Sequence, residues 1–437
     1  MLDGIGIIKA GAGLPAEDTV SRLIGESVRS PKIYGFRIDP SKSDPAQAVT
    51  YLADAVGKTP AAMGAGSFSY GGWADAFFMP RPCMLKYDGT VDYYLDPNDY
   101  TKKEDGTASD VANVNYGGNA MMEWPLIWFK YEAGEADGEG YFYCSDKRVD
   151  SSYKCWCNID ANDRIIPHFY TAVYNGTGLT KLRSLSGGRL IPANGAGNTT
   201  PQQENDRALA NNTGDTVEWY TDVFCDRLLI SGLLVLMGKS LDVPGVFGRG
   251  IGGYSTFVPT DYYTGTLNDK GLFWGSSGNN SAVKVFGMEN WYGMFWRRTA
   301  GIMTDTHNKI YYKLTYGRAD GSSGKGYGTD GSGYLSVNSL DSSGWVTKMD
   351  FTGGIPVPKA VSGDTFSDIG NIYYRCYYIY KPRASVNYGH MTRSLFGSGY
   401  DSNSNRLNLA APYTLCADSA DSATYLSTAL SCKPAKK

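Results

Sequence analysis

The sequence predicts an α+β fold, in which two helices are combined with many short strands. Two helical segments lie together near the middle of the chain, and short apolar runs separated by turn residues lie before and after them. Grouped helices and strands are typical of this class, whereas a regular alternation of the two favours a parallel sheet. With 42% hydrophobic residues, the 437-residue chain has enough apolar side chains for a sizeable core.

The N-terminal part is expected to contain an arm followed by β structure. Residues 1–30 mix small, polar and apolar residues without a clear period, so we interpret them as an attachment or trimerisation arm. Residues 32–39 alternate as a strand does. Residues 44–56, with Pro45 in the first turn, are predicted to form a short helix. Residues 31–117 together are expected to form a β-rich N-terminal domain.

Turn residues divide the next part of the chain. Asp88-Gly89 separates two apolar runs and predicts a hairpin. The polar residues 102–117 predict a loop, and we place a domain boundary there. Further strands are expected at residues 121–130, 139–144 and 153–158.

Two helices are predicted near the middle of the chain. Residues 201–210 begin with proline and are followed by two asparagines, which are start and stop signals of a helix. Residues 217–240 carry apolar side chains at close to helical spacing, and Pro244 with the glycines after it ends this helix. From Tyr254 onward short apolar runs again alternate with loops, so residues 118–437 are predicted to form a second, α+β domain.

Charge and hydropathy exclude several classes of partner. The chain has 41 basic and 44 acidic residues, and this balance favours neither nucleic acid nor an anionic membrane as partner. The most apolar run, residues 228–237, is about ten residues long and too short to span a bilayer. The N-terminus lacks the basic and apolar regions of a secretory signal. We therefore expect no nucleic-acid partner and no membrane insertion.

Residues that bind metals or catalyse reactions are few and scattered. The eight cysteines show no zinc spacing and are expected to be buried free thiols. The three histidines, His168, His307 and His390, are not at the spacing of metal ligands. The sequence contains no nucleophile elbow, phosphate-binding loop or calcium loop. It predicts no metal, no cofactor and no catalytic residue, and hence a protein that is not an enzyme.

The C-terminal part has an unusual composition. Residues 371–432 contain no Glu, Gln or Trp and are rich in Tyr, Ser, Asn, Asp, Arg and Gly. Tyrosine gives a large amphipathic contact area, and Ser, Gly and Asn give adaptable hydrogen bonds, as in binding surfaces. Randomising the adenines of AAC codons excludes the same residues together with Lys and Met, so Lys381 and Met391 are predicted to be fixed positions. An ordinary tyrosine-rich β protein with loops is the alternative.

Residues 287–298 form a distinctive motif, Gly-Met-Glu-Asn-Trp-Tyr-Gly-Met-Phe-Trp-Arg-Arg. We interpret it as a turn with tightly packed aromatic rings, in which the two glycines permit close approach of the backbone. Trp296 is expected in the core, and Arg297 and Arg298 are expected to face outward.

This motif resembles the Gly-x-x-Asn-x-x-Gly-Asn-Val-Trp-Glu-Trp motif of the formylglycine-generating-enzyme branch of the C-type lectin fold. That branch includes variable proteins that retroelements diversify in phages and bacteria. Three other segments resemble, in order, the family's stretch before its helices, its long helix with the following loop, and its closing strand: residues 181–187, 226–250 and 429–434. Residues 34–39 and 81–90 are similar to N-termini of prophage tail-fibre proteins.

The resemblance implies a C-type lectin-like ligand-binding domain over residues 118–437, with a variable surface at about 371–431. It implies a phage tail-fibre or tail-tip receptor-binding protein of the virion, made in the host cytoplasm, that recognises a host cell-surface protein or glycan. It also implies a homotrimer whose N-terminal region contacts other tail proteins. The expected ligand contacts are Trp291, Tyr292, Tyr388, His390, Arg393, Phe396, Tyr400, Asp401, Asn403, Asn405, Tyr413, Asp418, Asp421 and Tyr425.

Two other functions stay open, a bacterial surface or secreted lectin-like adhesin and an oxidase of the formylglycine-generating type. The motif departs from the enzyme branch, because residues 294–298 read Met-Phe-Trp-Arg-Arg. The amide that helps bind calcium in that branch is absent, and an acidic position is basic. These departures favour a binding domain over an enzyme.

Overall fold

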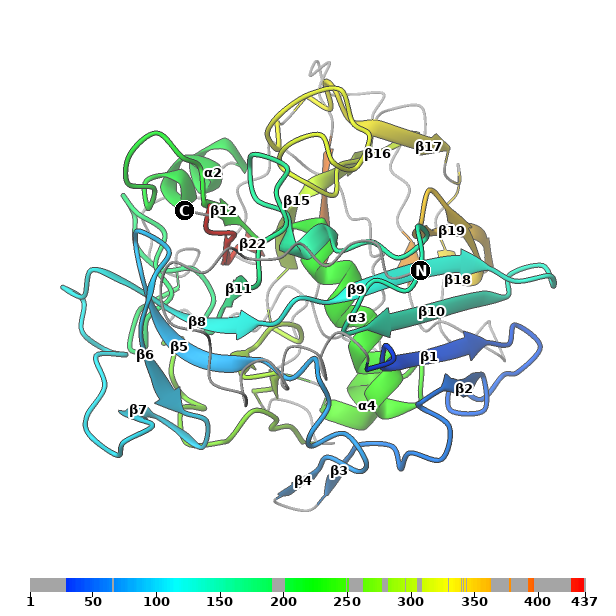
Figure 1. The fold of residues 1–437 in the computed structure, drawn as a ribbon, viewed down its shortest axis with the longest axis horizontal. Coiled ribbons are helices and arrows are strands. Elements are labelled where there is room, and N and C mark those ends of the chain that lie inside the picture. Colours follow the sequence, from blue (N-terminus) through cyan, green and yellow to red (C-terminus); the bar gives the residue numbers. More distant parts are fainter. Residues whose placement is uncertain are drawn as a thin grey trace, which may run out of the picture.

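The computed structural model describes residues 29–64, 67–190, 201–248, 250, 262–276, 282–294, 296–304, 309–328, 330–338, 340, 342, 344–362, 377–378, 392–396 and 426–435. Within them, helices are combined with mostly antiparallel strands in open sheets (Figure 1). The predicted α+β class is therefore confirmed.

A seven-stranded sheet gathers strands from distant parts of the chain, in the order β12-β23-β11-β8-β5-β6-β7. All of its pairings are antiparallel. The strands on the two sides of residue 117, the expected domain boundary, thus belong to one sheet. The bounds of its strands are β5 Arg81–Lys86, β6 Val91–Asp96, β7 Asp99–Lys103, β8 Gly118–Trp124, β11 Phe169–Ala172, β12 Trp219–Thr221 and β23 Leu430–Cys432.

A four-stranded antiparallel sheet has the order β2-β1-β10-β9, and helix α3 (Phe224–Gly238) passes beside it (Figure 1). Every residue of α3 is buried. A Cβ added to Gly232 would lie 2.6 Å from both the Phe142 ring and the Tyr131 hydroxyl, so glycine lets the helix approach the sheet closely. The strands are β1 Ile33–Ile38, β2 Val49–Ala53, β9 Trp128–Ala133 and β10 Gly140–Ser145.

The other helical elements are short. α2 (Pro201–Leu209) precedes β12, and α4 (Val243–Phe247) follows α3 after a left-handed residue, Lys239, with φ of 47°. The Asp242 carboxylate accepts a hydrogen bond from the Gly245 amide at 3.2 Å and caps α4. A single 3-10 turn, η1, spans Trp156–Asn158.

Smaller sheets lie in the C-terminal half and at one edge of the molecule. One has the order β17-β16-β15-β21, with β22 also paired to β15, and another has the order β19-β18-β20. β3 pairs with β4, and β13 with β14. The bounds are β3 Ala62–Gly64, β4 Ser67–Ser69, β13 Lys284–Val285, β14 Met288–Glu289, β15 Trp296–Thr304, β16 Lys309–Tyr312, β17 Leu335–Asn338, β18 Gly344–Thr352, β19 Ile355–Ser362, β20 Tyr377–Tyr378, β21 Thr392–Phe396 and β22 Leu426–Ser427.

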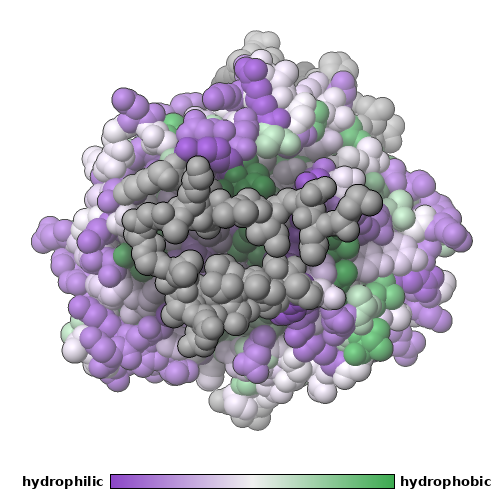
Figure 2. Space-filling model, viewed as in Figure 1, coloured by the Kyte–Doolittle hydropathy of each residue, from purple (hydrophilic) through white to green (hydrophobic). Residues whose placement is uncertain are grey.

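One large hydrophobic core joins these parts. It contains Trp124 of the seven-stranded sheet, Phe142 of the four-stranded sheet, Leu228 of α3 and Ile302 of β15. On the face shown in Figure 2, by contrast, hydrophilic side chains cover most of the described surface. The core is therefore enclosed by both sheets, the helix and the C-terminal strands together.

Several predicted elements are confirmed. β1 occupies the strand predicted at 32–39, and β10 occupies the one at 139–144. The Asp88-Gly89 hairpin is formed by β5 and β6, which pair antiparallel. The helix predicted at 201–210 is α2. These segments share a strong local signal, which the tertiary structure does not override.

Other element predictions are wrong or misplaced. Residues 44–56 form turns and then β2, because Val49 and Tyr51 alternate toward the core and pair beside β1. Residues 153–158 end in η1 instead of a strand. The strand predicted at 121–130 is divided into β8 and β9 around Pro125, which has no amide hydrogen to donate to a sheet.

The long predicted helix is also shorter than expected. Of residues 217–240, the first part forms β12, and α3 begins only at Phe224. β12 pairs with β23, so the apolar side chains before the helix are buried by a sheet. A run of apolar residues at this point satisfies both the helical and the strand pattern.

Candidate functional site

Strand β15 carries the attachment of the tyrosine-rich C-terminal part. β21 pairs with it antiparallel and matches Phe396 with Arg297. β22 pairs with it in parallel and matches Ser427 with the same Arg297. Since each side of a strand pairs with one neighbour, β21 and β22 lie on opposite sides of β15. The two described strands that flank residues 397–425 in the sequence therefore lie on opposite sides of β15.

A buried charged network lies next to this attachment. Arg297 donates from Nε to Asn175 Oδ1 at 2.7 Å, and its Nη1 lies 3.6 Å from Asp222 Oδ2. Arg227 of α3 donates to the same Asp222 oxygen at 2.8 Å. Burial lowers the pKa of Arg297 to about 10. The charge of Asp222 opposes this shift, and the charge of Arg227 adds to it. Asp222 thus connects β15 to the start of α3 through two arginines.

A second buried ion pair connects β15 to α2. Arg298 Nη1 lies 2.5 Å from Glu204 Oε1, and the two side chains are 0% and 2% exposed. The prediction that Arg297 and Arg298 face outward is therefore wrong. The carboxylates of Asp222 and Glu204 compensate the charges of the two buried arginines. Without such partners, burying a guanidinium would cost too much free energy.

Trp291 and Tyr292, expected as ligand contacts, are core residues. They are 1% and 0% exposed. The Arg227 guanidinium lies over the Trp291 ring at 4.4 Å from its centroid, and the Tyr292 hydroxyl donates to the Gly248 carbonyl oxygen at 2.8 Å. The aromatic motif supports the scaffold beside β15, so these two side chains do not form a contact surface in this structure.

Of the other expected contacts, the structure describes only two, and both lie in β21. Arg393 and Phe396 belong to that strand, where Arg393 is paired with Met303 of β15. The remaining ones lie outside the described residues: Tyr388, His390, Tyr400, Asp401, Asn403, Asn405, Tyr413, Asp418, Asp421 and Tyr425. Lys381 and Met391, predicted to be fixed positions, lie outside them as well.

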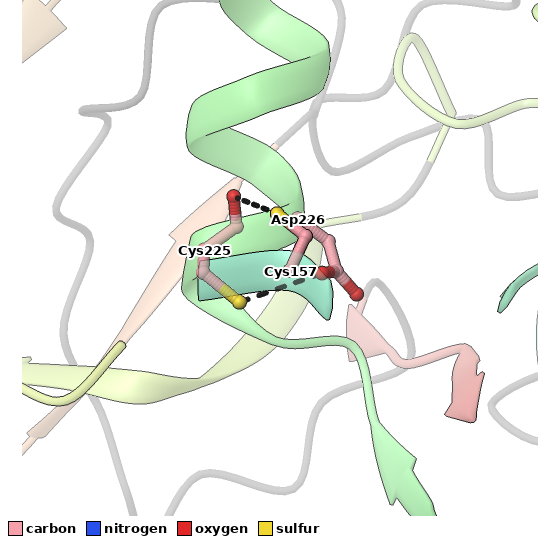
Figure 3. Close-up of side chains that lie close together, drawn as sticks. All are labelled: Cys157, Cys225 and Asp226. Carbon is pink, nitrogen blue, oxygen red and sulfur yellow. Dashed lines mark hydrogen bonds between the residues drawn. The ribbon is translucent and has the colours of Figure 1, made fainter. Parts of the chain in front are cut away.

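Two cysteines and a carboxylate meet where η1 approaches α3 (Figure 3). The Cys157 thiol donates to the Cys225 carbonyl oxygen at 3.2 Å, and the Cys225 thiol donates to Asp226 Oδ1 at 3.4 Å. Within the described part of the chain, these three form the one group of cysteine, histidine or acidic side chains close enough to share a metal ion. All three are buried. The six described cysteines are free and buried, as expected from the sequence.

A lysine already supplies the positive charge at this group. Lys433 Nζ lies 2.7 Å from Asp226 Oδ1 and donates to the Cys157 carbonyl oxygen at 2.6 Å. Ser431 donates to Asp226 Oδ2 at 2.7 Å. Burial, the largest single influence, lowers the pKa of Lys433, but the charge and hydrogen bond of Asp226 together with the nearby Cys225 and Cys157 outweigh burial and raise that pKa above its ordinary value.

These side chains do not fit a metal centre. Burial raises the pKa of the Cys157 thiol well above its ordinary value, whereas a metal requires the thiolate. An ion would also have to displace the Lys433 ammonium from Asp226. The group instead fastens the last strand, β23, to α3 and η1, and gives no support to the oxidase alternative.

The sequence contains a signal for these buried charges within α3. Asp226 and Arg227 interrupt an apolar helix in which all neighbours are buried. Charged side chains are rarely buried unless they are paired, so their position in such a run predicts partners. Arg227 pairs with the nearby Asp222, but Lys433, the partner of Asp226, is far away in the sequence, and only the fold brings this pair together.

Comparisons with known proteins do not assign the chain to a family. No protein-family model matches it, and no curated protein matches it. The resemblance to the C-type lectin fold therefore rests on the sequence motifs. Among the described helices, the longest of which is α3 with 15 residues, none combines the length and apolar character needed to cross a membrane.

Proposed function

We propose that this protein is a phage tail-fibre or tail-tip receptor-binding protein with a C-type lectin-like domain diversified by a retroelement. The observation that carries the proposal is that β21 and β22, the strands on either side of residues 397–425 in the sequence, both pair with β15. A segment with both ends held by a buried scaffold tolerates substitutions between those ends. This is the arrangement that a protein needs when it varies its ligand surface and keeps its fold.

The composition of the attached segment supports recognition. Residues 397–425 contain Tyr, Asn, Asp, Ser and Arg but no Glu, Gln, Lys, Met or Trp. The absent residues are the ones that substitution at the adenines of AAC codons never produces. The buried pairs of Arg297 and Arg298 hold β15 to the helices, so the base of the segment is rigid.

The proposal implies recognition without catalysis. The ligand is a protein or glycan on the host cell surface, and the N-terminal region contacts other tail proteins. Assembly as a homotrimer makes binding multivalent, so weak individual sites combine to give firm attachment. The protein is then found in the virion.

Phage adsorption tests the role of the segment. A phage carrying Tyr400→Ala together with Tyr425→Ala is expected to adsorb to its host at least about tenfold more slowly, because aromatic side chains dominate binding energy in such surfaces. Tyr263→Ala is the matched control, since Tyr263 is 48% exposed and lies outside the segment. Normal adsorption by a folded double variant would contradict the proposal.

The genes of related isolates test diversification separately. Substitutions are expected to concentrate at AAC-derived codons between Tyr388 and Thr428 and to spare Lys381 and Met391. An even spread of substitutions over the gene would exclude retroelement diversification. Mass spectrometry of purified virions distinguishes a tail protein from a cellular adhesin, because only the former is a stoichiometric virion component.

A further inference from the structure

A pocket of about 260 Å³ lies between α2, β12 and the loop after β16. Its wall combines aromatic rings, amide groups, a hydroxyl, an ammonium group and glycine backbone. The lining residues are Gln202, Asn205, Leu209, Tyr220, Thr221, Tyr316, Lys325, Gly326, Tyr327 and Gly328. None of the expected contact residues that the structure describes lines it, and neither does the charged network described above.

Three tyrosines form the aromatic wall. The ring centroids of Tyr220 and Tyr316 are 5.0 Å apart, and Tyr327 meets each of these rings edge-on, at 5.8 Å from Tyr220 and 5.7 Å from Tyr316. Tyr220 and Tyr327 are buried, whereas Tyr316 is only partly buried. The packing fixes the ring planes, and Tyr316 is the ring that retains exposed surface for a ligand.

One face of α2 forms the opposite wall. Gln202, Asn205 and Leu209 follow one another at spacings of three and four residues, so they lie on the same side of the helix. Asn205 Oδ1 accepts a hydrogen bond from Thr221 Oγ1 at 3.2 Å, which links this wall to β12. The pocket is thus lined by neutral polar groups on the side that faces the tyrosines.

The loop that supplies Tyr316 and Tyr327 is held from inside by a buried lysine. Lys313 Nζ donates to the carbonyl oxygens of Gly317 and Gly324, each at 2.6 Å, and to Ser322 Oγ. The Gly326 amide donates to the Tyr316 carbonyl oxygen at 2.7 Å. A loop tied by its own carbonyl groups to a fixed charge is preorganised, which lowers the entropic cost of binding.

The charge of the described pocket lining is positive. Lys325 is exposed at the pocket, and none of the described residues that line it carries a carboxylate. The volume equals that of about nine water molecules at liquid density, which suits a single ring-shaped ligand. A flat tyrosine surface, neutral amides and an ammonium group together match a sugar ring that carries one carboxylate.

We propose that this pocket binds one acidic sugar residue, with the ring against Tyr316 and the carboxylate at Lys325. Under the proposed function, on which the source of the ligand rests, this sugar belongs to a host surface glycan. The pocket then supplies a constant glycan subsite in addition to the diversified segment. Gly301 of β15 lies against Tyr327, since a Cβ added there would be 3.2 Å from the tyrosine ring, so the two sites share one scaffold strand.

Titration of the full chain with monosaccharides tests the pocket. The probes are glucuronate, galacturonate and N-acetylneuraminate, with glucose as the neutral and acetate as the ringless comparison, and binding is followed by saturation-transfer NMR. At least one acidic sugar is expected to saturate the protein at about millimolar concentration, as ligands of this size do. It should bind at least about fivefold more tightly than glucose, as a charge-assisted contact predicts. If no acidic sugar saturates, or if acetate competes equally well, the proposal is overturned.

Variants locate the binding. Lys325→Met should reduce the preference for the acidic sugar over glucose to near one, whereas Lys42→Met, an exposed lysine elsewhere, should leave it unchanged. Tyr316→Ala should weaken the binding of both sugars by about tenfold or more. Tyr316→Phe should keep the affinity for both, because the ring provides the contact. Unchanged sugar binding in Lys325→Met, which alters only an exposed side chain, would place the sugar elsewhere and overturn the assignment.

The outcomes are separable from those of the adsorption experiment. The Tyr400→Ala and Tyr425→Ala double variant is expected to keep its affinity for the acidic sugar even if it no longer adsorbs. Loss of sugar binding in this variant would place the sugar at the segment instead of the pocket. Absence of sugar binding in the wild type would remove the pocket proposal and leave the receptor role untouched.

Discussion

At the scale of single residues, Lys284 is a lysine enclosed by the core. It is 1% exposed, donates to the Leu267 carbonyl oxygen at 2.8 Å and lies 3.7 Å from the centroid of the Tyr100 ring. Burial, only partly offset by Glu289, lowers its pKa to about 7. In the unfolded chain a lysine keeps its proton up to a pH of about 10.4.

This difference predicts a pH-dependent stability. Between pH 7 and 9 the unfolded chain binds a proton at Lys284 that the folded protein has released, so the free energy of unfolding rises with pH. The contribution is at most about 1.4 kcal/mol per pH unit. Urea denaturation of the wild type and of Lys284→Met measures it, because the other titrating groups are common to both proteins. Identical pH slopes for the two proteins would contradict the assignment.

Lys433 predicts a large effect of a single charge. Lys433→Met leaves the buried Asp226 carboxylate without its ammonium partner and is expected to lower the free energy of unfolding by about 3–5 kcal/mol. Lys348→Met is the control, because Lys348 pairs with Asp137 at 2.5 Å but its side chain is 45% exposed. Denaturation with urea should show little change for the control.

The double variant completes the test. Asp226→Leu combined with Lys433→Met removes both charges and is expected to recover most of the lost stability, since an apolar pair replaces a buried ion pair at little cost. If the single Lys433 variant is as stable as the control, the ion pair contributes nothing to the free energy of unfolding and the prediction is wrong.

At the scale of elements, the contact of α3 with the four-stranded sheet depends on Gly232. Gly232→Ala is expected to destabilise the protein by about 1–3 kcal/mol, because the new methyl group would overlap the Phe142 ring. This loss exceeds the gain of about 1 kcal/mol that alanine brings to a helix. Gly117→Ala, with no atom within 4 Å of the added Cβ, is the control. Thermal unfolding that is unchanged in Gly232→Ala would show that the helix shifts freely.

Local patterns predicted the elements whose signal is complete within a few residues. The Asp88-Gly89 turn with its apolar flanks gave β5 and β6. The segment 44–56 has a proline suited to a first helical turn, yet β1 offers a pairing edge and makes β2 of Val49–Ala53. Some segments fit both the helical and the strand pattern. Predictions fail there because the choice depends on an element that is near in space but distant in the sequence.

The candidate site could be predicted only in part, for the same reason. The tyrosine-rich composition is a property of the sequence and marks the region attached to β15. The burial of Trp291 and Tyr292 depends on what packs over them, and Arg227 contacts Trp291 from another element. The pocket beside Tyr316 depends on three segments that approach one another only in the folded chain.

At the scale of the whole molecule, β23 lies inside the seven-stranded sheet although it is the last of the described strands in the sequence. It pairs with β12 on one side and with β11 on the other. A chain that ends after Thr428 lacks β23 and leaves two strands with unpaired backbone groups in the interior. Cooperative thermal unfolding, followed by near-UV circular dichroism, is expected to disappear in this variant.

The matched control ends after Ala435 and keeps β23 together with Lys433. Its Ala435 amide still donates to Glu218 Oε1 at 3.0 Å. This shorter deletion is expected to retain a sharp unfolding transition. A sharp transition in the longer deletion would mean that the sheet closes without its last strand.

The position of β23 also makes folding depend on the reading frame of the segment before it. The strand is encoded after residues 397–425, so a frameshift or a stop codon within that segment removes it. During synthesis the preceding parts of the chain leave the ribosome first, and the sheet is completed only when the last strand arrives. If the proposed diversification is correct, a copy with a frame error in this segment yields no folded product, whereas a copy with substitutions alone does. Under the proposed function, proteolysis in the host cell would remove such failed copies before they reach an assembled particle.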